Sequence, residues 1–162
     1  MISKKVILTG SFGVGKTSLF RRFIENKFDE KYLTTIGVKV DKKVVEVGDR
    51  KLTLIIWDIA GEVKQDKVPT AYFMGTHGLV YVLDLTRPDT YKNIAEDIEY
   101  LQKISPKSTI KVVGNKCDLL ESEEALEKVL AEIPVPCNFT TSAKTGENVE
   151  TLFAELSAAM LA

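Results

Sequence analysis

The strongest constraint on the fold is a glycine-rich stretch near the start of the chain. Residues 10–17 read Gly-Ser-Phe-Gly-Val-Gly-Lys-Thr and match the pattern Gly-x-x-x-x-Gly-Lys-[Ser/Thr]. The run before it, residues 4–9, is short, apolar and β-branched, and it predicts a buried strand. Leu19, Phe20 and Phe23 follow at the spacing of one helix face. The sequence therefore predicts a strand, a tight glycine-rich turn and a helix in succession.

This stretch has the composition of a phosphate-binding loop. Glycines let the backbone curl so that successive N–H groups point inward, and the helix that follows contributes the positive end of its dipole. Lys16 would span the two terminal phosphates, and the Thr17 hydroxyl would be a ligand of Mg2+, which prefers oxygen atoms. The alternative is an ordinary glycine-rich turn between a strand and a helix.

The rest of the chain alternates β-rich runs with helical patterns. Val38–Val47 and Arg50–Trp57 flank Gly48-Asp49, which indicates a hairpin. Further strands are expected at 79–85, 109–114 and 137–141, and helices at 62–74, from about residue 91, at 121–133 and at the chain end. This alternation predicts an α/β fold with a mostly parallel sheet covered on both faces. Ligands of such sheets bind at the carboxyl ends of the strands, where each non-periodic motif of this chain falls.

Asp58 and Gly61 form an Asp-x-x-Gly motif at the end of a predicted strand. A carboxylate there can reach Mg2+ through a water molecule, and a glycine N–H can meet the terminal phosphate. Many strand-to-turn junctions contain this pattern, so its functional reading depends on the loop at residues 10–17.

A second pair of motifs indicates a guanine base. Asp118 is suited to accept hydrogen bonds from the N1–H and 2-amino groups of guanine, and a buried carboxylate without those donors would be costly. Asn115 would brace the loops, while the stem of Lys116 can lie over the base. The N–H of Ala143, in Ser142-Ala143-Lys144, could meet the guanine carbonyl oxygen. The alternatives are a solvated charged turn and an ordinary loop.

Composition limits the class of protein. The 162 residues suit one domain, residues 1–162, and the net charge of −1 gives no footprint for nucleic acid or anionic membranes. Two cysteines favour a reducing compartment, and we expect a cytoplasmic monomer. No apolar run is long enough to span a membrane, and no lipidation signal is visible, so no membrane anchor is expected in this chain.

Together these motifs resemble those of Ras-superfamily small GTPases, in the same order and at similar separations. The resemblance covers essentially the whole chain, and the Thr-Thr-Ile-Gly-Val run at 34–38 and residues 72–78 are most similar to the Rab branch. It implies a P-loop NTPase G domain: a six-stranded, mostly parallel sheet with one antiparallel strand and helices on both faces. It also implies GTP or GDP as ligand, with Mg2+, and hydrolysis of GTP.

The resemblance assigns roles to particular residues. Catalysis would involve Lys16, Thr35, Gly61 and Glu62, and Mg2+ would be bound by Thr17, Thr35 and Asp58. Phe28 would pack against the guanine or else belong to the core, and Tyr32 would close over the phosphates or else lie on the surface. The residues expected to contact nucleotide are Ser11, Phe12, Gly13, Val14, Gly15, Lys16, Thr17, Ser18, Phe28, Tyr32, Thr35, Asp58, Gly61, Asn115, Lys116, Asp118, Leu119, Ser142, Ala143 and Lys144.

Partner binding is expected through two segments. Effector and regulatory proteins would contact residues 28–40 and 60–76, where Thr35 and Gly61 sense the γ-phosphate. Val40, Trp57 and Phe73 match an apolar triad that Rab-like proteins present to effectors, although that branch usually has Phe where this chain has Val40. His77 precedes a buried strand and is expected to be structural.

Two positions depart from the family pattern. Glu62 replaces the glutamine that orients the attacking water, and Phe12 replaces a small residue. Both predict slow hydrolysis, and Gln65 is a candidate substitute for the water-orienting group. Two functional readings remain: a switch that cycles between GTP and GDP, and a GTP-binding scaffold with negligible hydrolysis. An ATP-using P-loop kinase is disfavoured by Asp118 and by the absence of a substrate-lid segment.

Overall fold

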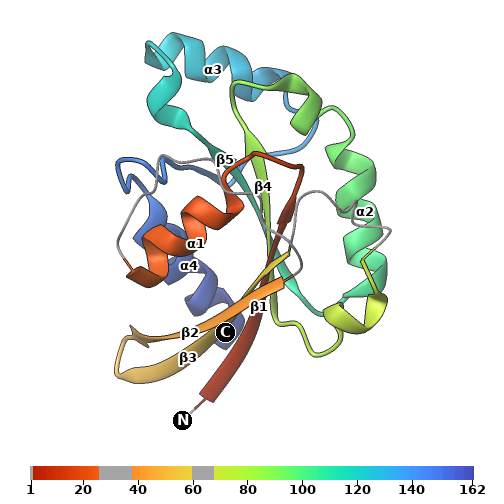
Figure 1. Cartoon of the computed structure of the whole chain (residues 1–162), viewed down its shortest axis with the longest axis vertical. Helices are drawn as coiled ribbons and strands as arrows, with labels where there is room; N and C mark the ends of the chain where they lie inside the picture. Colours follow the sequence, from red (N-terminus) through yellow and green to blue (C-terminus); the bar gives the residue numbers. More distant parts are fainter. Residues whose placement is uncertain (1, 26–37, 60–67) are drawn as a thin grey trace.

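A six-stranded sheet in the order β2-β3-β1-β4-β5-β6 forms the centre of the molecule. The structure is a computed structural model and describes residues 2–25, 38–59 and 68–162. β2 pairs with β3 in antiparallel fashion, and all other neighbouring strands are parallel (Figure 1). The strands are β1 Ile2–Gly10, β2 Val38–Val47, β3 Arg50–Ile59, β4 Gly78–Asp84, β5 Thr109–Asn115 and β6 Phe139–Thr140.

Helices cover both faces of this sheet, as the sequence predicted. α1 and α4 lie on one face and α2 and α3 on the other (Figure 1). Their bounds are α1 Lys16–Glu25, α2 Ile94–Ile104, α3 Glu123–Glu132 and α4 Val149–Leu161, and 3₁₀ helices span η2 Thr70–Phe73, η3 Pro88–Thr90 and η4 Cys117–Leu119.

Alternation along the central strands divides the core into two layers. Val6 and Leu8 of β1 belong to the layer with α1 and α4, whereas Ile7 belongs to the layer with α2. In the first layer the rings of Phe23 and Phe153 stack with centroids 3.9 Å apart, which joins α1 to α4. Because every side chain of β4 is buried, this strand is covered on both faces, as a central parallel strand requires.

Two predicted elements differ from those in the structure. The segment 62–74 was expected to be a helix, but its described part, residues 68–74, contains only the 3₁₀ helix η2, preceded by Pro69 and ended by an extended Met74. Pro69 has no N–H to donate and fixes its own φ, which favours a short turn here. β3 continues to Ile59, so Asp58 lies within the strand and opposite Leu8 of β1, not beyond its end.

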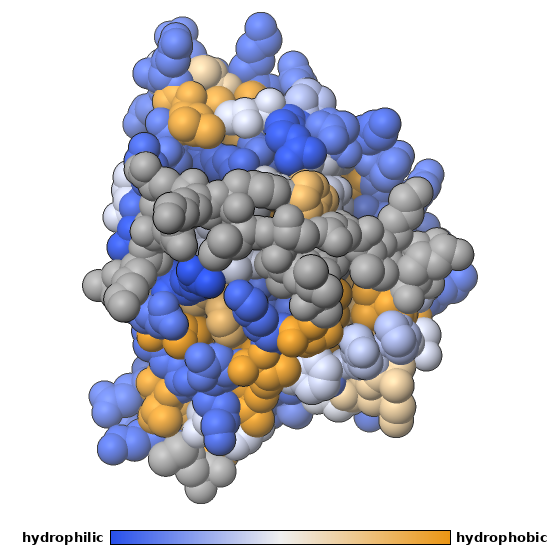
Figure 2. Space-filling view, viewed as in Figure 1, coloured by the Kyte–Doolittle hydropathy of each residue, from blue (hydrophilic) through white to orange (hydrophobic). Residues whose placement is uncertain are grey.

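The surface carries both hydrophilic and hydrophobic residues. The face shown in Figure 2 is mostly hydrophilic, and its hydrophobic residues form separate groups. Within the described ranges, none of the helices has the length and apolar character needed to cross a bilayer.

Candidate functional site

The glycine-rich loop joins the carboxyl end of β1 to the start of α1 at the centre of the sheet. Gly15 has φ +101°, and a Cβ on it would lie 2.2 Å from Asn115 Nδ2. A side chain at this position would therefore be excluded by both conformation and space. Glycine at position 15 therefore lets the backbone turn and pass close to the Asn115 side chain.

Lys16 is a buried cation at the start of α1. Its Nζ donates to the carbonyls of Gly10 at 2.9 Å and Ser11 at 3.0 Å, and the residue is only 5% exposed. Burial lowers the pKa of this ammonium to about 8, and the charge of Asp58 partly opposes the shift. An anion inside the loop would restore the stability of the charged form.

Thr17 and Asp58 form a polar pair beside this lysine. The Thr17 Oγ1 donates to Asp58 Oδ2 at 2.7 Å, and Asp58 is fully buried. Burial raises the pKa of Asp58, while the Thr17 hydrogen bond and then Lys16 lower it. Among the described residues, Asp58 Oδ1 has no hydrogen-bond partner. A buried, unpartnered carboxylate oxygen next to a hydroxyl suits a hard cation or its bound water.

Asn115, at the end of β5, connects two loops. Its Nδ2 donates to Val14 O at 3.0 Å, and its Oδ1 accepts from Thr141 Oγ1 at 3.0 Å and from the Ala143 N–H at 3.3 Å. This is the position for which the sequence predicted a brace. The Ala143 N–H, which the sequence analysis assigned to a base carbonyl, is directed to Asn115 in this structure.

Asp118 lies in the short turn η4 beside the loop at 142–144. Ser142 Oγ donates to Asp118 Oδ1 at 2.8 Å, which orients the carboxylate. Arg22 of α1 also holds the loop at 142–144, because its Nε donates to Ala143 O at 2.7 Å. The two loops expected to hold a base thus lie together and are connected to α1.

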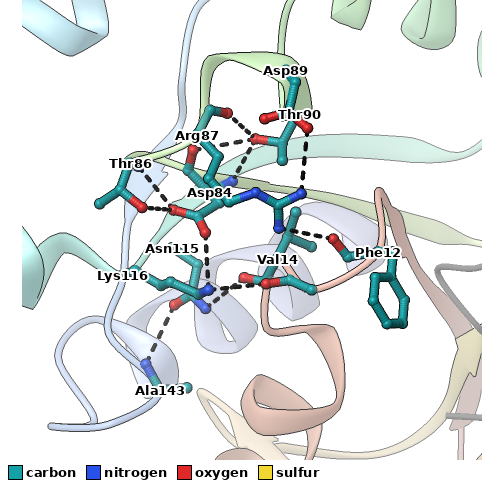
Figure 3. Close-up of polar contacts among 11 residues, drawn as sticks. Phe12, Val14, Asp84, Thr86, Arg87, Asp89, Thr90, Asn115, Lys116 and Ala143 are labelled. Carbon is teal, nitrogen blue, oxygen red and sulfur yellow. Dashed lines mark hydrogen bonds and ion pairs between the residues drawn. The ribbon is translucent and has the colours of Figure 1, made fainter. Parts of the chain in front are cut away.

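Asp84 and Arg87 are polar residues that the sequence analysis did not assign to the site (Figure 3). Asp84 is fully buried; its Oδ1 accepts from Thr86 N and Oγ1, and its Oδ2 lies 2.9 Å from Lys116 Nζ. Lys116 Nζ also donates to Gly13 O at 2.9 Å. A carboxylate at the end of an otherwise apolar strand was the available signal, because a buried charge requires a partner.

Other predicted site residues lie in three settings. Ser11 and Ser18 are half-buried on the loop and on α1, while Phe12, Leu119 and Lys144 are exposed. The remaining predictions concern residues that lie outside the described ranges, namely Phe28, Tyr32, Thr35, Gly61, Glu62 and Gln65.

The predicted apolar triad is only partly on the surface. Val40 is 51% exposed and lies opposite Trp57 in the β2–β3 pair. Phe73 is 2% exposed and packs in the core layer of α2, so the expectation that it is presented to partners is wrong in this structure. Its neighbours Tyr72 and Met74 are exposed instead, because the 3₁₀ turn η2 points Phe73 inward.

His77 has the structural position expected from the sequence. Its ring Nδ1 accepts from the backbone N–H of Lys5 at 3.0 Å, and its backbone N–H donates to Lys5 O at 2.9 Å. Burial, followed by the charge of Lys4, lowers the pKa of His77 and favours the neutral ring that can accept this bond.

Comparison with known proteins identifies the family. The family model described as Ras family matches residues 5–162. The chain is 34% identical over 159 residues to Ras-related protein Rab-1C of Dictyostelium discoideum, covering 94% of this chain and 78% of the relative. It is 34% identical to Ras-related protein SEC4 of Candida albicans, covering 94% and 75% of the two chains. With Ras-related protein Rab-10 of Caenorhabditis elegans the identity is 33%, and the coverage is 98% and 81%.

The family model matches nearly the whole chain, and the polar groups around the glycine-rich loop agree with that match. The chain belongs to the Ras family and is a Rab-like, GTP-binding small GTPase.

Proposed function

We propose that the protein is a molecular switch that binds GTP and GDP together with Mg2+, hydrolyses GTP slowly and changes its partners accordingly. The observation that carries this proposal is the polar group at the glycine-rich loop, which consists of the buried Lys16 and Asp58 and the half-buried Thr17. It combines a positive charge for a polyphosphate with a hydroxyl and an unpartnered carboxylate oxygen for a cation.

Mg2+ fits the donors that the chain offers. Among residues 2–25, 38–59 and 68–162, no three His, Cys, Asp or Glu side chains gather into a metal cage. Mg2+ commonly keeps several waters and binds through one or two protein oxygens plus substrate phosphates. Thr17, Thr35 and Asp58 would hold the ion, which would neutralise charge on the phosphates.

Base selectivity is proposed to reside in Asp118, which Ser142 orients. Calorimetry on folded, nucleotide-stripped protein with Mg2+ compares GDP with ADP. Asp118 is exposed in this structure, and a bound base would cover its carboxylate. We expect GDP to bind at least about a hundredfold more tightly than ADP, because adenine lacks the matching donors and would leave the covered carboxylate unpaired. Equal affinities would refute the guanine site.

The proposal that GTP hydrolysis is slow rests on two side chains, Phe12 and Glu62. Phe12 is 41% exposed on the glycine-rich loop. Its ring would add bulk in the space that a water-orienting group or a partner's arginine would take. A Glu62 carboxylate about 4 Å from a phosphate oxygen would be repelled by roughly 4 kcal/mol per unit charge at an effective dielectric near 20. Glu62 must therefore turn away from the γ-phosphate or bind a proton.

Single-turnover hydrolysis of bound GTP tests this part. We expect Glu62→Gln to accelerate the reaction at least severalfold and Phe12→Gly to add to that effect. The affinity for GTP, measured on the same variants, distinguishes an effect on the hydrolysis step from an effect on nucleotide binding. An increase below twofold for Glu62→Gln, or hydrolysis by the unmodified protein at the rate of an ordinary family member, would contradict the proposal.

A GTP-binding scaffold is the second candidate, and the exposed Phe12 favours it. The nucleotide that copurifies with the protein, identified by chromatography, distinguishes the two. GDP in the pocket supports a cycling switch, whereas GTP that persists through purification and for hours afterwards supports the scaffold.

Partner binding is proposed to involve the β2–β3 surface around Val40 and Trp57. The centroid of the Trp57 ring lies 5.9 Å from that of the Tyr72 ring, and Lys5 Nζ lies 3.9 Å from the Trp57 centroid. These two contacts hold the Trp57 ring in place. A photo-crosslinking residue at position 40 should give adducts in cell extract that depend on GTP loading. The same residue at position 44, also exposed on β2, is the control, and equal labelling from both positions would argue against a specific surface.

A further inference from the structure

We propose that Arg87, in the turn after β4, is a positioning residue of the nucleotide site. Its guanidinium holds the Phe12 carbonyl on the outside of the phosphate loop and thereby directs the Gly13 N–H toward the bound phosphates. This role rests on the proposed function, because it presupposes a polyphosphate in the loop.

The contact between Arg87 and the loop is close and specific. Arg87 Nη1 donates to Phe12 O at 3.0 Å (Figure 3). A Cβ on Gly13 would lie 2.9 Å from the same nitrogen, and Gly13 has φ +76°. Glycine at position 13 therefore allows both the turn of the loop and the approach of the guanidinium.

Peptide geometry converts this contact into an orientation. In a planar trans peptide the C=O and the N–H point in opposite directions, and the described residues contain no cis peptide bond. Fixing Phe12 O on the side of Arg87 therefore turns the Gly13 N–H to the other side, into the loop.

The next two peptides of the loop are held in the same way. Lys116 Nζ holds Gly13 O at 2.9 Å and Asn115 Nδ2 holds Val14 O at 3.0 Å, which directs the N–H groups of Val14 and Gly15 inward. Arg87 thus extends a series of side-chain donors from the β5 loop to the β4 loop. Successive inward N–H groups form an anion-binding concavity, and donors on the carbonyl side polarise each peptide further.

The turn that carries Arg87 is itself fixed by a buried threonine. The Arg87 carbonyl accepts from Thr90 N at 3.0 Å and Oγ1 at 2.7 Å, and the Arg87 N–H donates to Asp84 O at 3.0 Å. Asp89 Oδ2 lies 3.3 Å from Arg87 Nη2 and orients the guanidinium from the solvent side. The contact is a charge-assisted hydrogen bond from a side chain that is 40% exposed, so its effect on nucleotide retention should be moderate.

The test measures the release of fluorescent GDP, with Mg2+ present, from Arg87→Gln. We expect release about tenfold faster than from the unmodified protein, at the low end for a hydrogen bond to a charged group. Arg87→Lys retains the charge without the planar fork and should fall between the two, and Asp89→Asn should change the rate by about twofold or less. Arg50→Gln, at the opposite end of the sheet, is the matched control and should release GDP at the original rate.

A second readout separates positioning from general stability. In the GDP complex, the amide proton resonance of Gly13 should move upfield in Arg87→Gln, because its hydrogen bond to phosphate weakens. The resonances of Val14 and Gly15 should move less, since Lys116 and Asn115 still hold their peptides. Arg87→Lys should partly restore the Gly13 resonance.

The outcomes are distinguishable. Failure of the unmodified protein to bind fluorescent GDP would overturn the proposed function and this role with it. Normal binding, with release from Arg87→Gln within twofold of the control or with an unmoved Gly13 resonance, would overturn the role of Arg87 alone.

Discussion

At the scale of single residues, Asp118 is the side chain to which we assign the selection of the base. Its Oδ1 accepts from Ser142 Oγ at 2.8 Å, so one neighbour fixes its orientation before any ligand binds. Preorganised acceptors discriminate strongly because a ligand without matching donors leaves them unpaired.

Replacing Asp118 by Asn should therefore remove the preference for guanine. The amide places a donor where the base also presents donors, and we expect GDP affinity to fall at least about a hundredfold. Competition binding with fluorescent GDP measures the effect, and Glu121→Gln, an exposed carboxylate shortly after the turn, is the control. Retention of GDP binding within threefold would show that Asp118 does not contact the base.

Cys117, adjacent to Asp118, should be a poor nucleophile in the folded protein. Burial and then Glu147, whose Oε2 accepts from Sγ at 3.3 Å, raise the pKa of this thiol to about 12. A raised pKa means less thiolate at pH 8, so we expect a disulfide reagent to react about a hundredfold more slowly than with the unfolded chain. Stopped-flow labelling in a Cys137→Ala background measures this rate.

Glu147→Gln provides the matched variant for that measurement. Loss of the carboxylate charge lowers the pKa of Cys117 and should accelerate labelling, provided that the fold is retained. If labelling is as fast in the folded as in the unfolded protein, the environment described for Cys117 is wrong.

At the scale of elements, the ion pair between Asp84 and Lys116 joins the end of β4 to the end of β5. Lys116 adopts a left-handed backbone conformation, φ +68°, and from there its Nζ reaches both Asp84 and Gly13 O. The pair therefore connects two strand ends to the phosphate loop through one ammonium group.

Asp84→Asn keeps the shape of the side chain and removes its charge. We expect the free energy of unfolding of the stripped protein to fall by about 2 kcal/mol, below the cost of breaking a fully buried pair because Lys116 is one-third exposed. Urea denaturation at pH 7 measures the loss, with the exposed turn residue Asp49→Asn as control. A loss no larger than that of the control would mean that the pair contributes little to stability.

At the scale of the whole molecule, nucleotide and cation should stabilise the fold together. The loops that surround the proposed site follow β1, β4, β5 and β6 and the site includes Asp58 of β3, so a ligand there contacts much of the sheet. A ligand that binds only the folded state stabilises it by about 2.7 kcal/mol at a hundred times its Kd.

GDP with Mg2+ should therefore raise the Tm by roughly 5–10 °C at that concentration, because about 1 kcal/mol corresponds to 2–4 °C in a chain of this size. Chelation of Mg2+ should remove part of the shift, and Thr17→Ala should abolish the difference made by chelation. Calorimetric melting with ADP in place of GDP is the control. A Tm shift that is insensitive to Mg2+ would exclude Thr17 and Asp58 as an ion site.

The sequence by itself determined the class of fold and the loops that make up the candidate site. Residues 10–17, 115–118 and 142–144 are contiguous patterns at strand ends, and the hydrophobic spacing of α1 and the composition of β4 depend on neighbouring residues only. Such short-range signals can be read from one chain.

The tertiary structure decided which distant side chains lie beside the candidate site. Arg87 and Phe12 are 75 positions apart and meet because β1 and β4 are parallel neighbours whose carboxyl ends lie together. The partners of Asp84 and the burial of Phe73 depend in the same way on packing between segments. No local pattern encodes a contact of this kind, because its energy depends on the pairing of strands that are remote in sequence.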